Sequence, residues 1–112
     1  MNEKYPVYIK WYKTLDWILD TAEKYPKSVR FTISGKISEF SVIIMEKIIE
    51  AIYSKKRIDI LQEINIYIEK LRVFFRISYD RKYISTNQFE FICTEIEETG
   101  KMIGGWIRSC KE

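Results

Sequence analysis

One stretch, residues 55–82, constrains the fold of this chain more than any other. When its residues are placed at about 100° per residue, as in a helix, the apolar side chains form two lines with polar side chains between them. The first line predicts a core stripe: Leu61, Ile64, Ile68, Leu71 and Phe75. A second stripe lies roughly opposite: Ile66, Val73 and Ile77. The polar strip between the two contains Asn65, Arg72 and Arg76. The stretch therefore predicts one helix with a core face, a candidate partner surface and a basic strip.

The rest of the chain predicts three further helices with short connections, so we expect an all-α, up-down four-helix bundle. The first is expected over residues 8–24, because Pro26 pushes the residue before it out of the helical region. The second begins between residues 28 and 31 and runs to about 54, since its β-branched residues recur at a helical spacing. The third ends near residues 79–82. The fourth starts at a capping box formed by Ser85 and Gln88 and frays beyond Arg108. The expected core residues outside the third helix are Tyr8, Trp11, Leu15, Ile18, Leu19, Ala22, Ile33, Ile37, Phe40, Ile44, Ile48, Ala51, Phe89, Ile92, Ile96, Ile103 and Ile107.

Composition limits the class of protein. With 112 residues the chain is expected to form one domain, residues 1–112. Its apolar runs are only a few residues long and its first residues lack an apolar leader pattern, so we expect a cytoplasmic protein that does not enter a membrane. The chain has no histidine and no Cys-x-x-Cys motif, so we expect no metal site, no cofactor and no histidine-based acid–base catalysis. Cys93 and Cys110 lie about 25 Å apart along one expected helix, too far to form a disulfide.

The net charge of +3 is modest, but it is unevenly distributed. Residues 55–82 carry eight basic and four acidic side chains, whereas the other segments are close to balanced or acidic. This concentration predicts a local anion-binding surface.

A second apolar stripe also runs along the second expected helix, at the spacing found on the third: Val42, Ile49 and Tyr53. Two neighbouring helices with matching extra stripes predict an interface between copies of the chain. The alternatives are an enlarged core within one protomer, or chance. On the fourth helix, Gly100, Gly104 and Gly105 are unfavourable in a helix interior, so we expect them to allow close approach of another backbone or of Trp106.

Several short motifs resemble one family when taken in their order and spacing, from about Trp11 to Arg108. The segments that carry the resemblance are Tyr25-Pro26-Lys27-Ser28-Val29-Arg30-Phe31, Leu71-Arg72 with Arg76, Ile84-Ser85 with Gln88-Phe89, and Gly100-Lys101-Met102-Ile103-Gly104-Gly105-Trp106. They are similar to the accessory variability determinant (Avd) proteins of diversity-generating retroelements, which are related to four-helix-bundle proteins encoded by intervening sequences of bacterial large-subunit rRNA genes.

The resemblance implies a four-helix protomer that assembles into a barrel-like homopentamer. It also implies that the protein binds a reverse transcriptase and RNA or DNA. In that role it supports mutagenic copying of template RNA into cDNA and has no catalytic activity of its own.

The strongest candidates for nucleic-acid contact are Arg72 and Arg76, which lie four residues apart on one helix face and could bind successive phosphates. Glu69 and Asp80 lie at helical spacing from them, so pairing within the helix is the alternative.

The remaining candidate nucleic-acid contacts are Lys27, Arg30, Lys55, Lys56, Arg57, Arg81 and Lys82. A solvated turn is the simpler interpretation of residues 55–57. Arg30 matches the family motif, and the alternative is that it closes the first connection against a carboxylate or a helix terminus. Any contribution of Arg81 and Lys82 is expected to be nonspecific and salt-dependent.

Tryptophans can stack on bases. Trp11 and Trp106 lie on or beside core stripes, so we expect them to pack within the protomer. Trp17 falls off the core stripe of its helix and is the better candidate for a partner contact.

Two functional hypotheses of different classes remain. The first is a nucleic-acid-binding accessory subunit of a reverse transcriptase. The second is a homo-oligomeric helical scaffold or adaptor, encoded in an rRNA intervening sequence, that binds protein or rRNA and uses its arginines in ion pairs. A di-iron carboxylate enzyme is disfavoured, since such bundles need histidine ligands.

Overall fold

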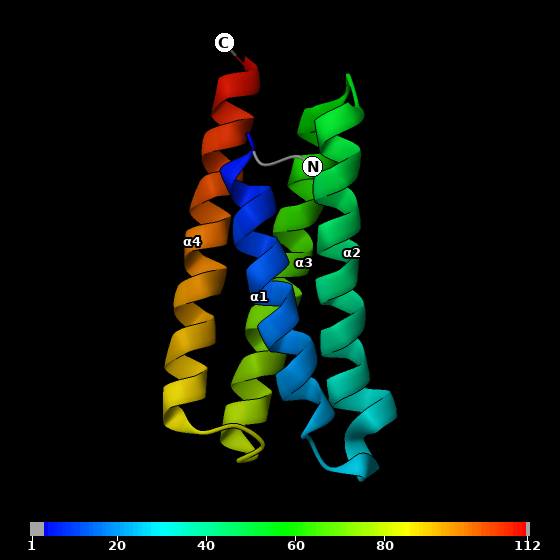
Figure 1. Cartoon of the computed structure of the whole chain (residues 1–112), viewed down its shortest axis with the longest axis vertical. Coiled ribbons are helices and arrows are strands. Elements are labelled where there is room, and N and C mark those ends of the chain that lie inside the picture. Colours follow the sequence, from blue (N-terminus) through cyan, green and yellow to red (C-terminus); the bar gives the residue numbers. More distant parts are fainter. Residues whose placement is uncertain (1–3, 112) are drawn as a thin grey trace.

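The computed structural model describes residues 4–111 and shows a four-helix bundle (Figure 1). Its helices are α1 (Pro6–Glu23), α2 (Gly35–Tyr53), α3 (Arg57–Asp80) and α4 (Thr86–Lys111). A 3-10 turn (Lys27–Val29) and a π-helical turn (Arg30–Ser34) lead into α2. Consecutive helices run in opposite directions and pack against each other, and α1 also packs against α4. The predicted all-helical bundle is confirmed.

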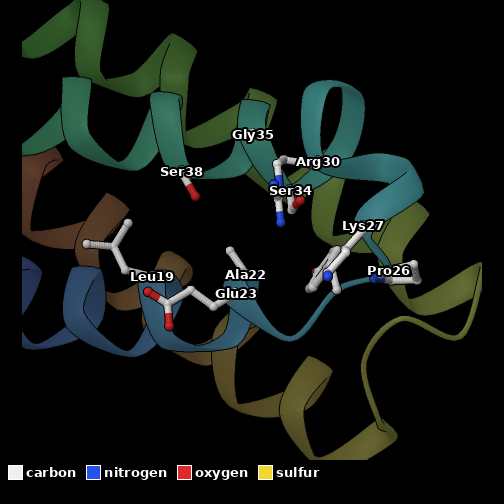
Figure 2. A pocket seen from close by; sticks show the side chains of 10 residues that line it. Leu19, Ala22, Glu23, Pro26, Lys27, Arg30, Ser34, Gly35 and Ser38 are labelled. Atoms are coloured by element: carbon white, nitrogen blue, oxygen red, sulfur yellow. The ribbon is translucent and has the colours of Figure 1, made fainter.

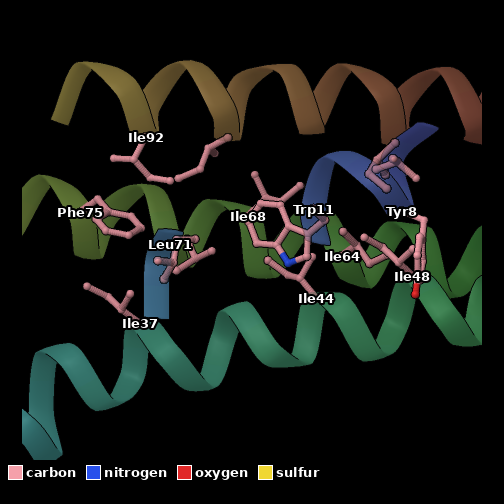
Figure 3. Close-up of a cluster of buried hydrophobic side chains, with 14 of the residues drawn as sticks. Tyr8, Trp11, Ile37, Ile44, Ile48, Ile64, Ile68, Leu71, Phe75 and Ile92 are labelled. Carbon is pink, nitrogen blue, oxygen red and sulfur yellow. The ribbon is translucent and has the colours of Figure 1, made fainter. Parts of the chain in front are cut away.

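The core follows the predicted periodicity closely. All five core-stripe residues of α3 are at most 3% exposed. They interdigitate with buried side chains from the other helices (Figure 3), among them Trp11, Ile37, Ile44, Ile48 and Ile92. Burial of these apolar side chains is the main contribution to the stability of the fold.

Some expected core positions lie at its edge. Leu19 is exposed, because it lies about 100° around α1 from the buried Ile18 and so faces the edge between α1 and α2. Five other expected core residues are only half-buried: Leu15, Ile33, Phe40, Phe89 and Ile107.

Polar residues take core positions that apolar periodicity did not predict. Four buried hydroxyl groups donate to the carbonyl oxygen four residues earlier in their own helix, so none is left unpaired. These are Thr14, Ser41, Ser78 and Thr99.

The helix ends agree with local signals at most boundaries. The capping box is confirmed: the Gln88 amide donates to Ser85 Oγ at 3.1 Å, and the Ser85 amide donates to Gln88 Oε1 at 2.8 Å. Helix α1 begins earlier than expected because Pro6 fits the first helical turn, where its missing N–H costs nothing. The expected fraying beyond Arg108 is wrong, since α4 continues to Lys111.

A three-residue ion-pair cluster joins α1 to α4. Lys10 Nζ lies 2.5 Å from carboxylate oxygens of both Glu95 and Glu98. Hydrogen bonds to Glu95 and Glu98 raise the pKa of Lys10, and the hydrogen bond from Lys10 lowers the pKa of Glu98. The cluster therefore fixes the pairing of the first and last helices.

The glycines of α4 do not allow a close approach within the protomer. A Cβ atom on Gly100 would meet nothing within 4 Å, and one on Gly104 or Gly105 would meet only the Arg108 side chain, at 3.6 Å. Within the described residues, no other segment of the protomer makes the expected close approach, and an approach by the backbone of another subunit stays a prediction.

We expect Gly100→Ala to raise the free energy of unfolding by up to about 1 kcal/mol, because alanine is the better helix former and its methyl group has room. Urea denaturation checks this value. Gly35→Ala is the contrasting variant and should destabilise, since its Cβ would collide with the Arg30 carbonyl oxygen. A loss of stability in Gly100→Ala would mean that another subunit occupies the space beside Gly100.

Candidate nucleic-acid interface

The predicted nucleic-acid contacts fall in three separate places on the bundle. One group lies at the end where α1 meets α2 and α3 meets α4, and a second lies at the opposite end, where α2 meets α3 (Figure 1). The bundle measures 45 Å along its long axis, so one protomer does not bring these groups together. The third group lies on the side of α3.

The first group brings together cations that are distant in the sequence. We call this surface the basic end and define it by four exposed side chains: Lys27, Arg30, Arg81 and Lys82. Ring contact between Tyr25 and Tyr83, with centroids 5.5 Å apart, joins the two connections that carry them. The two connections that carry the cations of the basic end therefore lie against each other at one end of the bundle.

The second connection of the basic end has a defined backbone and one fixed cation. Arg81 Nε donates to the Tyr83 hydroxyl at 2.8 Å, which raises the pKa of Arg81, and its guanidinium lies 5.7 Å from the ring centroid. Lys82 adopts the left-handed conformation, φ 63°, directly after the end of α3. Its side chain stays exposed.

The group at the opposite end is divided between a structural residue and two exposed ones. Arg57 donates from Nε to the Ala51 carbonyl at 2.8 Å and from a terminal nitrogen to the Ile52 carbonyl at 2.9 Å. It thereby satisfies orphan carbonyls in the last turn of α2, and its guanidinium lies 5.9 Å from the Trp106 ring centroid. Lys55 and Lys56 remain exposed beside an open hollow of about 580 Å³.

The arginines on the side of α3 each pair with a carboxylate of their own helix. Arg72 Nε lies 3.2 Å from Glu69, and Arg76 Nε lies 3.1 Å from Asp80. Exposed pairs of this kind contribute only about 0.3–0.5 kcal/mol, so a phosphate can compete for the guanidinium groups. Both arginines lie near Cys93, where their charges partly offset the rise in the pKa of the thiol that burial causes.

The tryptophans are mostly used for packing. Trp11 is fully buried and donates from its indole nitrogen to the Ser41 carbonyl at 3.0 Å, as its place on the core stripe predicted. Trp106 is half-buried against Tyr5, with ring centroids 5.2 Å apart. Trp17 lies 5.0 Å from the ring of Phe91, so part of its surface is covered within the protomer.

The second stripes do not enlarge the core of the protomer. Ile66 is 58% exposed and Val73 is 54% exposed, while Ile77 is half-buried. On α2 the stripe is also exposed at Val42 and Ile49. Apolar side chains thus remain uncovered on the outer faces of two helices.

Among the exposed aromatic residues that the sequence analysis did not identify as surface features are Phe31 and Tyr12. Phe31 is 90% exposed in the π-helical turn beside the basic end, and Tyr12 is exposed on α1. The sequence did contain a signal that Phe31 is a surface residue: it directly follows the cation Arg30, in a segment without helical apolar periodicity.

Other kinds of site lack support in the part of the chain that the structure describes. No group of three or more cysteine, aspartate or glutamate side chains could hold a metal ion there. Cys93 and Cys110 are free thiols. Among residues 4–111, no helix is both long enough and apolar enough to cross a membrane.

A family model described as bAvd-like matches residues 3–110, which is nearly the whole chain. A search of curated proteins found no match.

Proposed function

Because the chain belongs to the bAvd-like family, we propose that it is a non-catalytic accessory subunit of a diversity-generating retroelement. In this role it binds the reverse transcriptase and nucleic acid and supports mutagenic copying of template RNA into cDNA. The family match confirms the resemblance that the sequence motifs carried. Membership of this family is the reason for proposing the reverse transcriptase and nucleic acid as partners.

The observation that carries the nucleic-acid part of the proposal is the basic end. Two connections from different parts of the chain present the exposed side chains of Lys27, Arg30, Arg81 and Lys82 at one end of the bundle. Clustered cations of this kind bind phosphates by releasing counterions, which needs no particular base sequence. Such binding suits a protein that handles a template of variable sequence.

The exposed second stripes support assembly into a homo-oligomer, which we propose to be the homopentamer implied by the family. Apolar side chains that stay exposed in rows on two neighbouring helices are typical of an interface with a partner. A ring would repeat the basic end in every subunit, so that weak sites act together through avidity.

One observation favours the alternative, a homo-oligomeric scaffold that binds protein or rRNA. Arg72 and Arg76 are both engaged by carboxylates of their own helix, as that hypothesis expects. A scaffold that binds only protein does not explain why cations without an ion-pair partner among residues 4–111 gather at the basic end.

Salt-dependent binding tests the proposal. We expect the chain to shift RNA or DNA in a native gel at low salt, and the double variant Arg81→Gln/Lys82→Asn to bind more weakly. The slope of log K against log salt concentration should become shallower by about 1.4, or about 0.7 for each lost phosphate contact to a single strand. Asparagine is chosen because it tolerates the left-handed backbone of Lys82.

The matched control removes two charges elsewhere: Lys13→Gln on α1 with Lys101→Gln on α4. It should leave the salt slope close to that of the wild-type chain. An equal loss in both double variants would show that only net charge matters. Absence of binding by the wild-type chain at low salt would favour the scaffold.

A further inference from the structure

An open hollow of about 350 Å³ lies where the end of α1 meets the start of α2 (Figure 2). Its lining combines apolar groups with Lys27, Arg30, Ser34 and Ser38. Figure 2 shows the side chains of Lys27 and Arg30 directed into this space from the first turns leading to α2. The Ser34 hydroxyl already donates to the Val29 carbonyl oxygen at 3.4 Å, so the hollow combines two positive charges with the hydroxyl group of Ser38.

Neither cation in the hollow is neutralised within the protomer. No described carboxylate forms an ion pair with the side chain of Lys27 or Arg30. Glu23 also lines the hollow, but its carboxylate is directed away from both cations (Figure 2). Among residues 4–111 the Ser38 hydroxyl has no hydrogen-bond partner, so it too is available to a ligand. This arrangement suits an anion with several acceptor oxygens.

The backbone conformation at the hollow depends on one glycine. Arg30–Ser34 form a π-helical turn, and a Cβ atom on Gly35 would collide with the Arg30 carbonyl oxygen. Single π-helical turns occur frequently at functional sites, because the extra residue in the turn redirects the side chains around it. Here the turn carries Arg30, which lines the hollow, and Phe31, the next residue of the chain.

Phe31 is the most exposed of the large apolar side chains, at 90%. It follows Arg30 directly, so the two Cα atoms are about 3.8 Å apart. An uncovered aromatic ring beside unpaired cations is the combination with which proteins bind single-stranded nucleic acid: bases stack on the ring while cations hold the backbone. A protein partner would need an acidic and apolar surface at the same place, whereas a nucleotide supplies both groups by itself.

We propose that this surface is a subsite for single-stranded nucleic acid, in which the hollow takes a backbone phosphate and Phe31 stacks on an adjacent base. Lys27 and Arg30 neutralise the phosphate, and Ser38 donates a hydrogen bond to it. A paired duplex cannot use the ring, because its bases are already stacked on one another. The inference rests on the proposed function and deepens it, since it names the strandedness of the ligand and the residues that select it.

Phe31→Ala tests the stacking step by fluorescence anisotropy with a labelled oligouridylate, a labelled oligothymidylate and a labelled RNA duplex. We expect affinity for both single strands to fall roughly 5- to 150-fold while affinity for the duplex is unchanged. Phe31→Trp should retain single-strand affinity, because tryptophan also presents a stacking face. Because Phe31 is exposed, its replacement should leave the fold intact, which a thermal melt verifies.

Lys27→Gln/Arg30→Gln tests the phosphate step. We expect the salt slope for oligouridylate to become shallower by about 0.7, as for one lost phosphate contact, and Phe31→Ala to leave that slope unchanged. Lys13→Gln/Lys101→Gln again serves as the matched control.

Four results would overturn the subsite. Equal losses for single strands and duplex in Phe31→Ala would exclude stacking. Unchanged oligonucleotide binding with weakened binding to the reverse transcriptase would make Phe31 a protein contact. If the wild-type chain binds none of the three probes, the nucleic-acid part of the proposed function fails together with the subsite. If the wild-type chain binds the probes and both Phe31→Ala and Lys27→Gln/Arg30→Gln bind them equally well, the subsite alone is excluded.

Discussion

Replacing Ile66 and Val73 by glutamate is expected to convert the proposed oligomer into folded monomers. Both side chains lie on the outer face of α3 and are more than half exposed, so their replacement leaves the core of the protomer untouched. In a ring, each subunit would bury two uncompensated carboxylates against an apolar neighbour, at a cost of several kcal/mol per subunit. Light scattering should give the mass of one protomer, 13.6 kDa.

The same variant should also bind nucleic acid more weakly, although it retains every cation. Loss of avidity reduces affinity by about 100-fold or more when several weak sites act together. The control adds two carboxylates at exposed polar positions of α4, Asn87→Glu and Thr94→Glu, and should remain oligomeric. If Ile66→Glu/Val73→Glu kept the mass of the wild-type assembly, α3 would not be part of the interface. Loss of the cooperative thermal unfolding of the helices would instead show that the substitutions damage the protomer.

The sequence predicted the bundle because its core-facing positions recur at the helical period. The α3 stripe, for instance, is buried at every expected position. Local signals predicted the capping box as well, since it needs only Ser85 and Gln88 at the right spacing. Fold features that depend on a single segment could thus be predicted without the structure.

Features that depend on packing between segments were harder to predict from the sequence. Leu19 has the right residue type for the core, but its angle on α1 places it at the edge between two helices. The π-helical turn at Arg30–Ser34 has no apolar periodicity from which it could be predicted. The glycines of α4 suggested a close approach that the protomer does not make.

For the candidate site, residue types were predictable but their grouping was not. Lys27 and Arg81 lie in different connections, and only the bundle topology and the contact between Tyr25 and Tyr83 join their surfaces. Arg57 looked like part of a basic cluster, yet its guanidinium caps the end of α2. Which cations stay free for a ligand is decided by such contacts.

The dependence of cDNA synthesis on this chain is the second large effect that we expect. If the chain is an accessory subunit, the reverse transcriptase of its retroelement should need it to copy the template RNA. Reactions that lack the chain should therefore give little or no mutagenised cDNA, and added wild-type chain should restore it. The Ile66→Glu/Val73→Glu monomer should restore it poorly, because its basic ends no longer act together.

Sequencing and quantifying the cDNA made by that reverse transcriptase, with and without the purified chain, tests the central claim most directly. The accessory role predicts that full-length, mutagenised cDNA is made only when the chain is present. The same yield and the same mutation frequency in its absence would contradict that role.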